Sequence, residues 1–316
     1  MDRIRIGIIG VKGIGSVYMN VVRAISDARL VAVTGPQDAY PRVSERDVRF
    51  FDDALEMLEE TRLDAVIITW QHGEELVKEA LKRKIPVLKE PPLAYPVEVA
   101  ENLVEVAREN KVTLMVSTPR RYTTMFQHAK RIIDENVVGG VLMARGCGIV
   151  DSTRFRVEGD FDPLVSTVYG MLDLYLWFFG KPLKIYSSCI GEQGLLSGCK
   201  KGLFNLHFQN DVIGSLVFGY SAGMQEENIV VYFEKGTMLA SWNELHVQNS
   251  AGSIITRELK IGRYFQDALR LQVERFIRIV QTRNRGERDL KEALNMVKIL
   301  DLALKSCREG REVAIP

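Results

Sequence analysis

The stretch Arg3-Ile-Arg-Ile-Gly-Ile-Ile-Gly-Val-Lys-Gly-Ile-Gly-Ser16 decides the fold. It reads as a buried strand over residues 4–9, a glycine turn, and a helix that begins at about Ile14. In such a turn the glycines let the backbone approach a pyrophosphate, and the helix N-terminus offers unpaired N–H groups and the positive end of its dipole. The usual fingerprint is G-x-G-x-x-G, and Lys12 stands at its middle glycine. The stretch therefore predicts a dinucleotide-binding turn with an altered phosphate loop.

Short apolar runs and helical patterns alternate over the first third of the chain. The apolar runs lie at residues 4–9, 30–33, 64–69, 86–88 and 112–116, and the helical patterns at 14–25, 53–61, 74–84 and 96–110. Asp52 or Asp53 stands where a helix N-cap belongs. Strands that alternate with helices in this way predict a doubly wound α/β fold with a parallel sheet.

The pattern changes after Pro119. Helices are expected at 125–136 and 164–179, a strand at 141–150, several β-like runs between 183 and 259, and two terminal helices at 265–282 and 290–307. We therefore predict two domains. Residues 1–118 form an NAD(P)-binding Rossmann domain, and residues 119–316 form an α+β substrate and oligomerisation domain with an open, largely antiparallel sheet. The terminal helices can pack back on the first domain.

Composition and charge exclude several classes of partner. The net charge is +1, from 42 Lys and Arg against 41 Asp and Glu, so there is no electrostatic case for binding nucleic acid or an anionic membrane. The longest apolar run, near residues 171–179, is too short to span a bilayer. The four cysteines form no CxxC pair and have no histidine at zinc spacing, so we expect reduced thiols and no metal site. A strand begins almost at the first residue, which argues against a signal peptide and for a cytoplasmic protein.

Five later stretches share one order and spacing with a known group of proteins. They are Asp64-Ala-Val-Ile-Ile-Thr-Trp-Gln-His72, Ile85-Pro-Val-Leu-Lys-Glu-Pro-Pro-Leu-Ala94, Arg120-Arg-Tyr122, Asp173-Leu-Tyr-Leu-Trp-Phe-Phe-Gly180 and Lys305-Ser-Cys-Arg-Glu-Gly-Arg-Glu-Val313. With the glycine turn they resemble the Gfo/Idh/MocA family (glucose–fructose oxidoreductase, inositol dehydrogenase and relatives) over nearly the whole chain. The resemblance implies an NAD(P)-binding Rossmann domain, followed by a domain that holds a small-molecule substrate and builds homodimers or homotetramers through its sheet.

The chain departs from the family at its catalytic positions. Pro91 stands where the family has the lysine of Glu-Lys-Pro. In the family's Asp-x-Gly-x-His-x-x-Asp pattern, Ser166 replaces the first aspartate, Gly170 replaces the histidine, and only Asp173 is kept. Gly35 stands where a ribose-binding acid is common. The site is therefore predicted to be degenerate.

Candidate cofactor contacts follow from the glycine turn and from the loops that the resemblance places beside the nicotinamide. They are Gly10, Lys12, Gly13, Ile14, Gly15, Thr34, Thr69, Trp70, Gln71, His72 and Glu90. The glycines can equally form a tight turn without a ligand, and Lys12 can either pair with a phosphate or fill the cofactor space. Because Gly35 removes an acid that would repel a 2′-phosphate, and Gln37 and Arg42 are near, the cofactor is NAD or NADP with a slight preference for NADP.

Candidate catalytic groups are Lys89, Tyr169 and Asp173. Lys89 offers a displaced ammonium or is a surface lysine. Tyr169 offers a phenol as a general acid, although one step along a helix rotates a side chain by about 100°, which can turn it into the core. Asp173 faces a cleft or is a structural carboxylate paired with one of the neighbouring arginines. Arg121 and Tyr122 are candidates for binding an anionic substrate, with a hinge salt bridge as the alternative.

Two functions remain open from the sequence. The first is an NAD(P)-dependent oxidoreductase that moves a hydride between the nicotinamide and a carbon bearing a hydroxyl or carbonyl on a sugar, cyclitol or other small compound. The second is a non-catalytic nucleotide- or sugar-binding sensor or accessory protein, which the loss of the family's Lys, Asp and His favours.

Overall fold

The computed structural model describes residues 3–36, 47–155, 162–191, 199–283 and 286–316. By their internal contacts these residues group into two compact units. The first holds the described residues up to Ser117 together with Leu269–Val297, and the second holds the remainder.

The first unit is built on a six-stranded sheet in the order β3-β2-β1-β4-β5-β6. Its strands are β1 (Ile4–Ile9), β2 (Ala28–Thr34), β3 (Arg49–Phe51), β4 (Ala65–Ile68), β5 (Val87–Lys89) and β6 (Leu114–Val116). Each neighbouring pair is parallel. Ile6, Ile8 and all four residues of β4 are fully buried, as expected for central strands with both faces covered. The order is that of a Rossmann fold, which confirms the predicted class.

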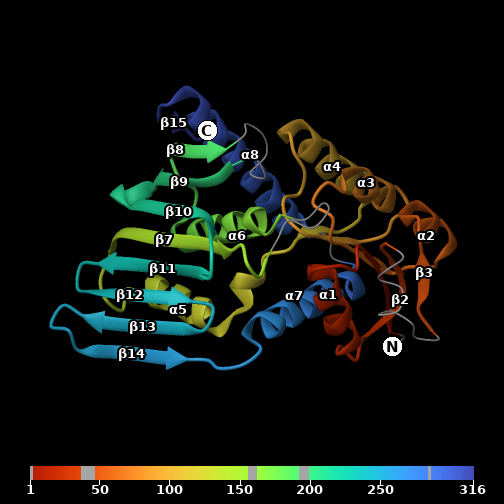
Figure 1. Cartoon of the computed structure of the whole chain (residues 1–316), viewed down its shortest axis with the longest axis horizontal. Coiled ribbons are helices and arrows are strands. Elements are labelled where there is room, and N and C mark those ends of the chain that lie inside the picture. The colour runs from red at the N-terminus through yellow and green to blue at the C-terminus, as the bar shows by residue number, and fades with distance from the viewer. Residues whose placement is uncertain (1–2, 37–46, 156–161, 192–198, 284–285) are drawn as a thin grey trace. The chain divides into compact units, whose positions relative to one another are not determined.

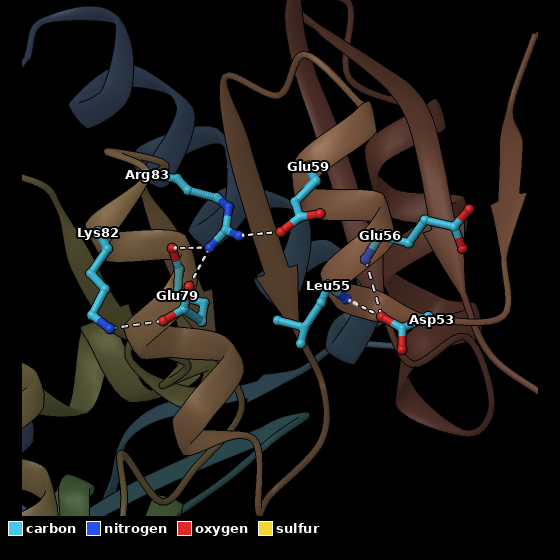
Figure 2. Close-up of polar contacts among 7 residues, drawn as sticks. All are labelled: Asp53, Leu55, Glu56, Glu59, Glu79, Lys82 and Arg83. Atoms are coloured by element: carbon cyan, nitrogen blue, oxygen red, sulfur yellow. Dashed lines mark hydrogen bonds and ion pairs between the residues drawn. The ribbon is translucent and has the colours of Figure 1, made fainter.

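The helices of this unit are α1 (Ile14–Arg23), α2 (Ala54–Glu60), α3 (Glu74–Lys82) and α4 (Val97–Asn110). Asp53 caps α2, because its carboxylate accepts from the backbone N–H groups of Leu55 and Glu56 at 2.6 and 3.0 Å (Figure 2). Arg83, just after α3, donates to Glu59 of α2 at 2.8 Å and also to Glu79 of α3 (Figure 2). This bridge links two helices that follow successive strands.

The second unit carries a nine-stranded sheet in the order β14-β13-β12-β11-β7-β10-β9-β8-β15. Its strands are β7 (Val141–Asp151), β8 (Lys184–Gly191), β9 (Cys199–His207), β10 (Ile213–Ser221), β11 (Glu226–Phe233), β12 (Gly236–Ser241), β13 (Glu244–Asn249), β14 (Ile254–Leu259) and β15 (Val313–Ala314). The β7–β10 pair is parallel and the other pairs are antiparallel. The prediction of a largely antiparallel sheet is confirmed.

Helices α5 (Thr124–Asp134) and α6 (Pro163–Phe179) lie on the same face of this sheet (Figure 1). α6 lies close to β7 and β10 because glycines face it. A Cβ at Gly146 would lie 2.8 Å from the Tyr175 hydroxyl, and a Cβ at Gly214 would lie 2.6 Å from the Tyr175 ring. The Tyr175 hydroxyl donates to the Ser215 carbonyl at 2.6 Å. The chain ends in α7 (Tyr264–Gln281), α8 (Glu287–Glu309) and β15. No helix within the described ranges is long and apolar enough to cross a membrane.

Candidate functional site

The glycine turn closes tightly between β1 and α1. Gly10 and Gly13 have φ angles of +89° and +51°, in the left-handed region that favours glycine. Gly15 lies against the turn, and a Cβ at this position would be 1.8 Å from the Gly10 carbonyl oxygen. The three glycines are therefore required by the geometry of the turn itself. Lys12 and Gly13 are exposed at its tip, and Ile14 is half-buried at the start of α1.

Two side chains from the end of β4 pack against this turn. The Thr69 hydroxyl is within hydrogen-bonding distance of the carbonyls of Ile9 and Gly10, at 3.1 and 2.8 Å. The Trp70 ring lies so close that a Cβ at Gly10 would be 2.7 Å from its indole nitrogen. The ends of β1 and β4 meet where the strand order reverses, which is where open α/β sheets bind ligands. Thr69 and Trp70 are thus brought to the turn, and their contact with a cofactor stays a prediction.

The end of β2 holds an unsatisfied hydroxyl. Thr34 is fully buried, and Oγ1 has no hydrogen-bond partner within the described part of the chain. Its backbone carbonyl accepts from the Gly10 N–H at 3.1 Å. The following Gly35 lies against Val11, and a Cβ there would be 2.5 Å from a Val11 methyl group. A side chain at residue 35 would therefore require Val11 to move. Gln37 and Arg42 lie outside the described residues.

The position of Lys89 differs from both sequence-based alternatives, a displaced catalytic ammonium and a surface lysine. Its side chain has no exposed area. The ammonium donates to the backbone carbonyls of Trp70, Gln71, Glu90 and Pro92 at 3.1, 2.9, 3.0 and 2.9 Å. A lysine ammonium has three donors and no acceptor, so these carbonyls occupy it fully. The geometry argues against proton transfer by Lys89 and for a positioning role, in which it ties together the loops that follow β4 and β5.

Glu90 belongs to a buried polar network that the sequence did not reveal. One carboxylate oxygen accepts from the Tyr18 hydroxyl at 2.5 Å, and the same hydroxyl lies 2.9 Å from Ser117 Oγ. The Gln272 amide donates to Ser117 Oγ at 2.9 Å. Burial, and then the negative charge of Glu90, raise the pKa of Tyr18 well above its ordinary value. The phenol therefore stays protonated and orients Glu90. Gln71 is also buried, whereas His72 is exposed at the surface of its loop.

Asp173 and Arg121 form one ion pair in the second unit. Arg121 donates through Nε and Nη2 to the two oxygens of Asp173, at 2.8 and 2.6 Å. Asp173 is buried on α6, and Arg121 comes from the short 3-10 helix η2 (Pro119–Tyr122). This bidentate ion pair agrees with the alternative in which Asp173 is a structural carboxylate. It also engages the Nε and Nη2 groups of Arg121, the residue predicted to bind an anionic substrate. Tyr122 is half-buried beside it.

Arg120 fills the space that Gly170 leaves open. A Cβ at Gly170 would lie 1.7 Å from Arg120 Nη1. Arg120 donates through Nε and Nη2 to one oxygen of Glu227 at 2.9 and 2.5 Å, and Trp242 Nε1 donates to the same oxygen at 2.8 Å. The guanidinium also stands 5.1 Å from the Trp242 ring centroid. The side chains of Arg120 and Glu227 are only 8% and 9% exposed.

None of Arg120, Glu227 and Trp242 was a sequence candidate. The sequence offered two signals, the mid-helix Gly170 and the paired Arg120 and Arg121. Glu227 and Trp242 lie more than 50 residues from either along the chain, so no local pattern connects them. Tyr169 is 1% exposed within the second unit, in line with the core-facing alternative. Among the residues that the structure describes, no three His, Cys, Asp or Glu side chains gather as metal ligands.

The strand order and the glycine turn at the switch point define the class as a dinucleotide-binding Rossmann protein. Residues 4–118 match the model of an oxidoreductase family with an NAD-binding Rossmann fold. This match covers about a third of the chain and supports the resemblance to the Gfo/Idh/MocA family.

Known proteins similar to this chain include two inositol 2-dehydrogenases. The protein from Rubrobacter xylanophilus is 31% identical over 189 residues, which cover 58% of this chain and 54% of that protein. The aligned stretch thus spans about half of that relative. The protein from Rhizobium meliloti is 23% identical, with 99% of both chains covered. The crystal structure of myo-inositol 2-dehydrogenase from Lactobacillus plantarum has a TM-score of 0.82 at 21% identity, over 100% of both chains. This likeness establishes the fold.

Proposed function

We propose that the protein is an NAD(P)-dependent oxidoreductase that acts on a cyclitol or another small polyhydroxylated compound such as a sugar. The observation that carries the proposal is the turn at Gly10–Gly15, closed by Thr69 at the switch point of the sheet. The inositol 2-dehydrogenases that resemble the chain support cyclitols as the first substrates to test.

The residues of the first unit fit a dinucleotide. The backbone N–H groups at the start of α1 would hold the pyrophosphate, and the exposed Lys12 adds a positive charge at the tip of the turn. The unsatisfied Thr34 hydroxyl lies at the end of β2, where the adenosine ribose of a Rossmann ligand belongs. Because Gly35 carries no acid, the site supports NADP as well as NAD. When bound, the nicotinamide supplies or accepts the hydride.

The first unit would position the cofactor by holding its loops rigid. Lys89 ties four backbone carbonyls of the loops after β4 and β5. The Tyr18 hydroxyl keeps the Glu90 carboxylate in one orientation. Removing either group leaves buried polar atoms unsatisfied and loosens the loops.

The second unit holds fixed charges beside residue 170, where the family has its histidine. Arg120, which is held by Glu227, turns Nη1 toward Gly170. A guanidinium is a donor and does not deprotonate in proteins, so Arg120 can stabilise an oxygen that gains charge but cannot act as a base. Asp173 keeps both oxygens on Arg121. Neither group can take a proton from an alcohol or give one to a carbonyl oxygen, so in either direction the proton would have to be exchanged with water or with the substrate itself.

A second candidate function is a binding protein that retains the nucleotide and performs no hydride transfer. Two observations favour it. The Lys89 ammonium is bound to backbone carbonyls, and Arg120 occupies the space beside Gly170. The two functions share a cofactor site and differ in turnover.

Fluorescence titration with NADH and NADPH tests both functions. Trp70 packs against Gly10, so we expect saturable quenching below millimolar cofactor, which Trp70→Phe removes and Trp177→Phe, in the second unit, preserves. Reduced cofactor is then incubated with keto-inositols and keto-sugars. Its oxidation supports the oxidoreductase, and binding without turnover supports the binding protein. Absence of quenching and of any thermal shift with either cofactor would overturn both.

A further inference from the structure

Three of the four cysteines meet at one end of the second unit, on β8, β9 and α8. The Cys189 backbone N–H donates to Cys307 Sγ at 3.2 Å, and the Cys307 thiol donates to the Cys189 carbonyl at 3.8 Å. Cys199 lies on the neighbouring strand β9, and its thiol donates to the Lys201 carbonyl at 3.5 Å. All three are free thiols. The composition of the chain predicted reduced cysteines but not that they would touch.

The pairing of β8 with β9 turns Cys189 toward Cys199. Cys189 lies opposite Gly202, and a Cβ on Gly202 would be 3.1 Å from Cys189 Sγ, so the sulfur extends over β9. Cys199 lies opposite Gly191, after an irregularity that follows Ile190. Residues 189 and 191 share one face of the strand, so Cys199 is a diagonal neighbour of Cys189 on that face. Diagonal Cα atoms lie about 7–8 Å apart, slightly beyond the usual disulfide range, so bridging needs a small local adjustment.

We propose that Cys189 and Cys199 form a reversible dithiol–disulfide pair that is oxidised by hydrogen peroxide or another small peroxide. The Cys199 thiolate attacks one peroxide oxygen, the O–O bond breaks, and with one proton a water leaves, which produces a sulfenic acid on Cys199. The Cys189 sulfur then attacks the Cys199 sulfur, the S–O bond breaks, and a second water leaves. The two thiols lose two electrons and two protons, and the peroxide gains them.

The surroundings of the sulfurs assign the order of these steps. The Cys199 thiol donates to the Lys201 carbonyl at 3.5 Å. The neighbouring Cys189 thiol lowers the pKa of Cys199, whereas Cys199 and burial raise the pKa of Cys189. Cys199 is therefore the first thiol of the pair to ionise, and Cys189 resolves the sulfenic acid. Cys199 is 4% exposed, which excludes bulky oxidants and admits a molecule of peroxide size more easily.

The chain offers one internal control, Cys147, and one competing thiol, Cys307. Cys147 lies on β7, three strands from β8 in the sheet order and thus about 14 Å away at 4.7–4.9 Å per strand. Burial and the nearby Glu226 raise the pKa of Cys147 to about 11, so it should react slowly. Cys307 touches the backbone of Cys189, and its thiol is directed at a carbonyl.

Peptide mapping of the whole chain under non-reducing conditions tests the proposal. The protein is reduced, desalted, exposed to a hydrogen peroxide series, alkylated and digested. We expect a peptide that joins Cys189 to Cys199, reversed by dithiothreitol, with an unchanged yield in Cys147→Ser and Cys307→Ser. In Cys189→Ser and Cys199→Ser any other cross-linked peptide should form with a yield at least tenfold below that of the Cys189–Cys199 peptide in the unsubstituted chain. The peptide map of the unsubstituted chain tests for the Cys189–Cys199 disulfide even if a variant fails to fold. A cross-link through Cys307 or Cys147, or sulfinic acid without any cross-link, would overturn the pair. The outcome does not depend on the proposed function.

Discussion

Gly170 is explained by a side chain from another element, and the explanation can be measured. A Cβ there would lie 1.7 Å from Arg120 Nη1, so Gly170→Ala should push Arg120 away from Glu227. Glu227 then loses its charged partner, and breaking a buried ion pair costs about 3–5 kcal/mol of unfolding free energy. In an Arg120→Ala background the clash is absent, and the same substitution should stabilise α6 by up to about 1 kcal/mol, because alanine is a better helix former than glycine.

The measurement is a double-mutant cycle by urea denaturation, read by circular dichroism. The predicted change of sign between the two backgrounds separates this contact from a general intolerance of α6. An equal cost for Gly170→Ala in both backgrounds would show that Arg120 does not occupy this space.

At the residue scale, the sequence supplied candidate residues but not the contacts that they make. Lys89 was picked out because it stands two residues before Pro91, yet the four carbonyls that bind its ammonium come from two loops. Arg121 and Asp173 were both candidates, and their pairing was one of the alternatives. Glu227 and Trp242 lie far along the chain from Arg120, so no local pattern could connect them. Side chains that meet across elements are fixed by packing, which periodicity does not encode.

At the scale of elements, strand β4 depends on an ion pair at its N-terminal edge. Asp64 accepts from the backbone N–H, Nε and Nη2 of Arg5 on β1, at 2.9, 2.9 and 2.7 Å. The hydrogen bonds from the Arg5 side chain are the main cause that lowers the pKa of Asp64. A carboxylate with a lowered folded pKa stabilises the fold above its unfolded pKa, about 3.9, and the contribution is lost as the pH falls through the folded pKa.

Asp64→Asn should therefore lower the unfolding free energy at pH 7, by at most about 1 kcal/mol because the pair is partly exposed. The difference from the wild type should shrink as the pH falls below 4. Urea denaturation between pH 7 and pH 3 checks this, with Asp47→Asn, whose partner Arg29 is exposed, as the control that shows no resolved difference. A difference that stays constant over this range would contradict the assignment to ionised Asp64.

Elements were predicted best where they are long and periodic. The central strands β1 and β4 stand out because an uninterrupted apolar run is needed to bury both faces. The three-residue β3 and the two-residue β15 were missed. Such short edge strands exist because a neighbouring strand offers hydrogen bonds, and they are too short to show a period.

At the scale of the whole molecule, the fold class followed from the alternation of strands and helices, and the assembly remains a prediction. The face of the nine-stranded sheet opposite α6 exposes Met143, Ile213 and Val217, which are 52%, 48% and 51% exposed. Ile213 pairs with Met143 and Val217 with Cys147 on the adjacent strands β10 and β7, so these side chains share one face. Apolar patches of this kind mark protein interfaces, and a flat sheet face fits a second copy of itself.

We expect the protein to form homodimers or homotetramers through this sheet face. Val217→Lys places a charge at the centre of the patch and should shift the mass measured by light scattering toward that of a single chain, because a buried unpaired ammonium opposes association. Leu55→Lys changes an equally apolar side chain, 43% exposed on α2 in the first unit, and should leave the assembly intact. The concentration series that reveals dissociation also gives its constant. A wild-type protein that runs as a single chain at all concentrations, or a Leu55→Lys variant that dissociates as readily as Val217→Lys, would rule out this face as the interface.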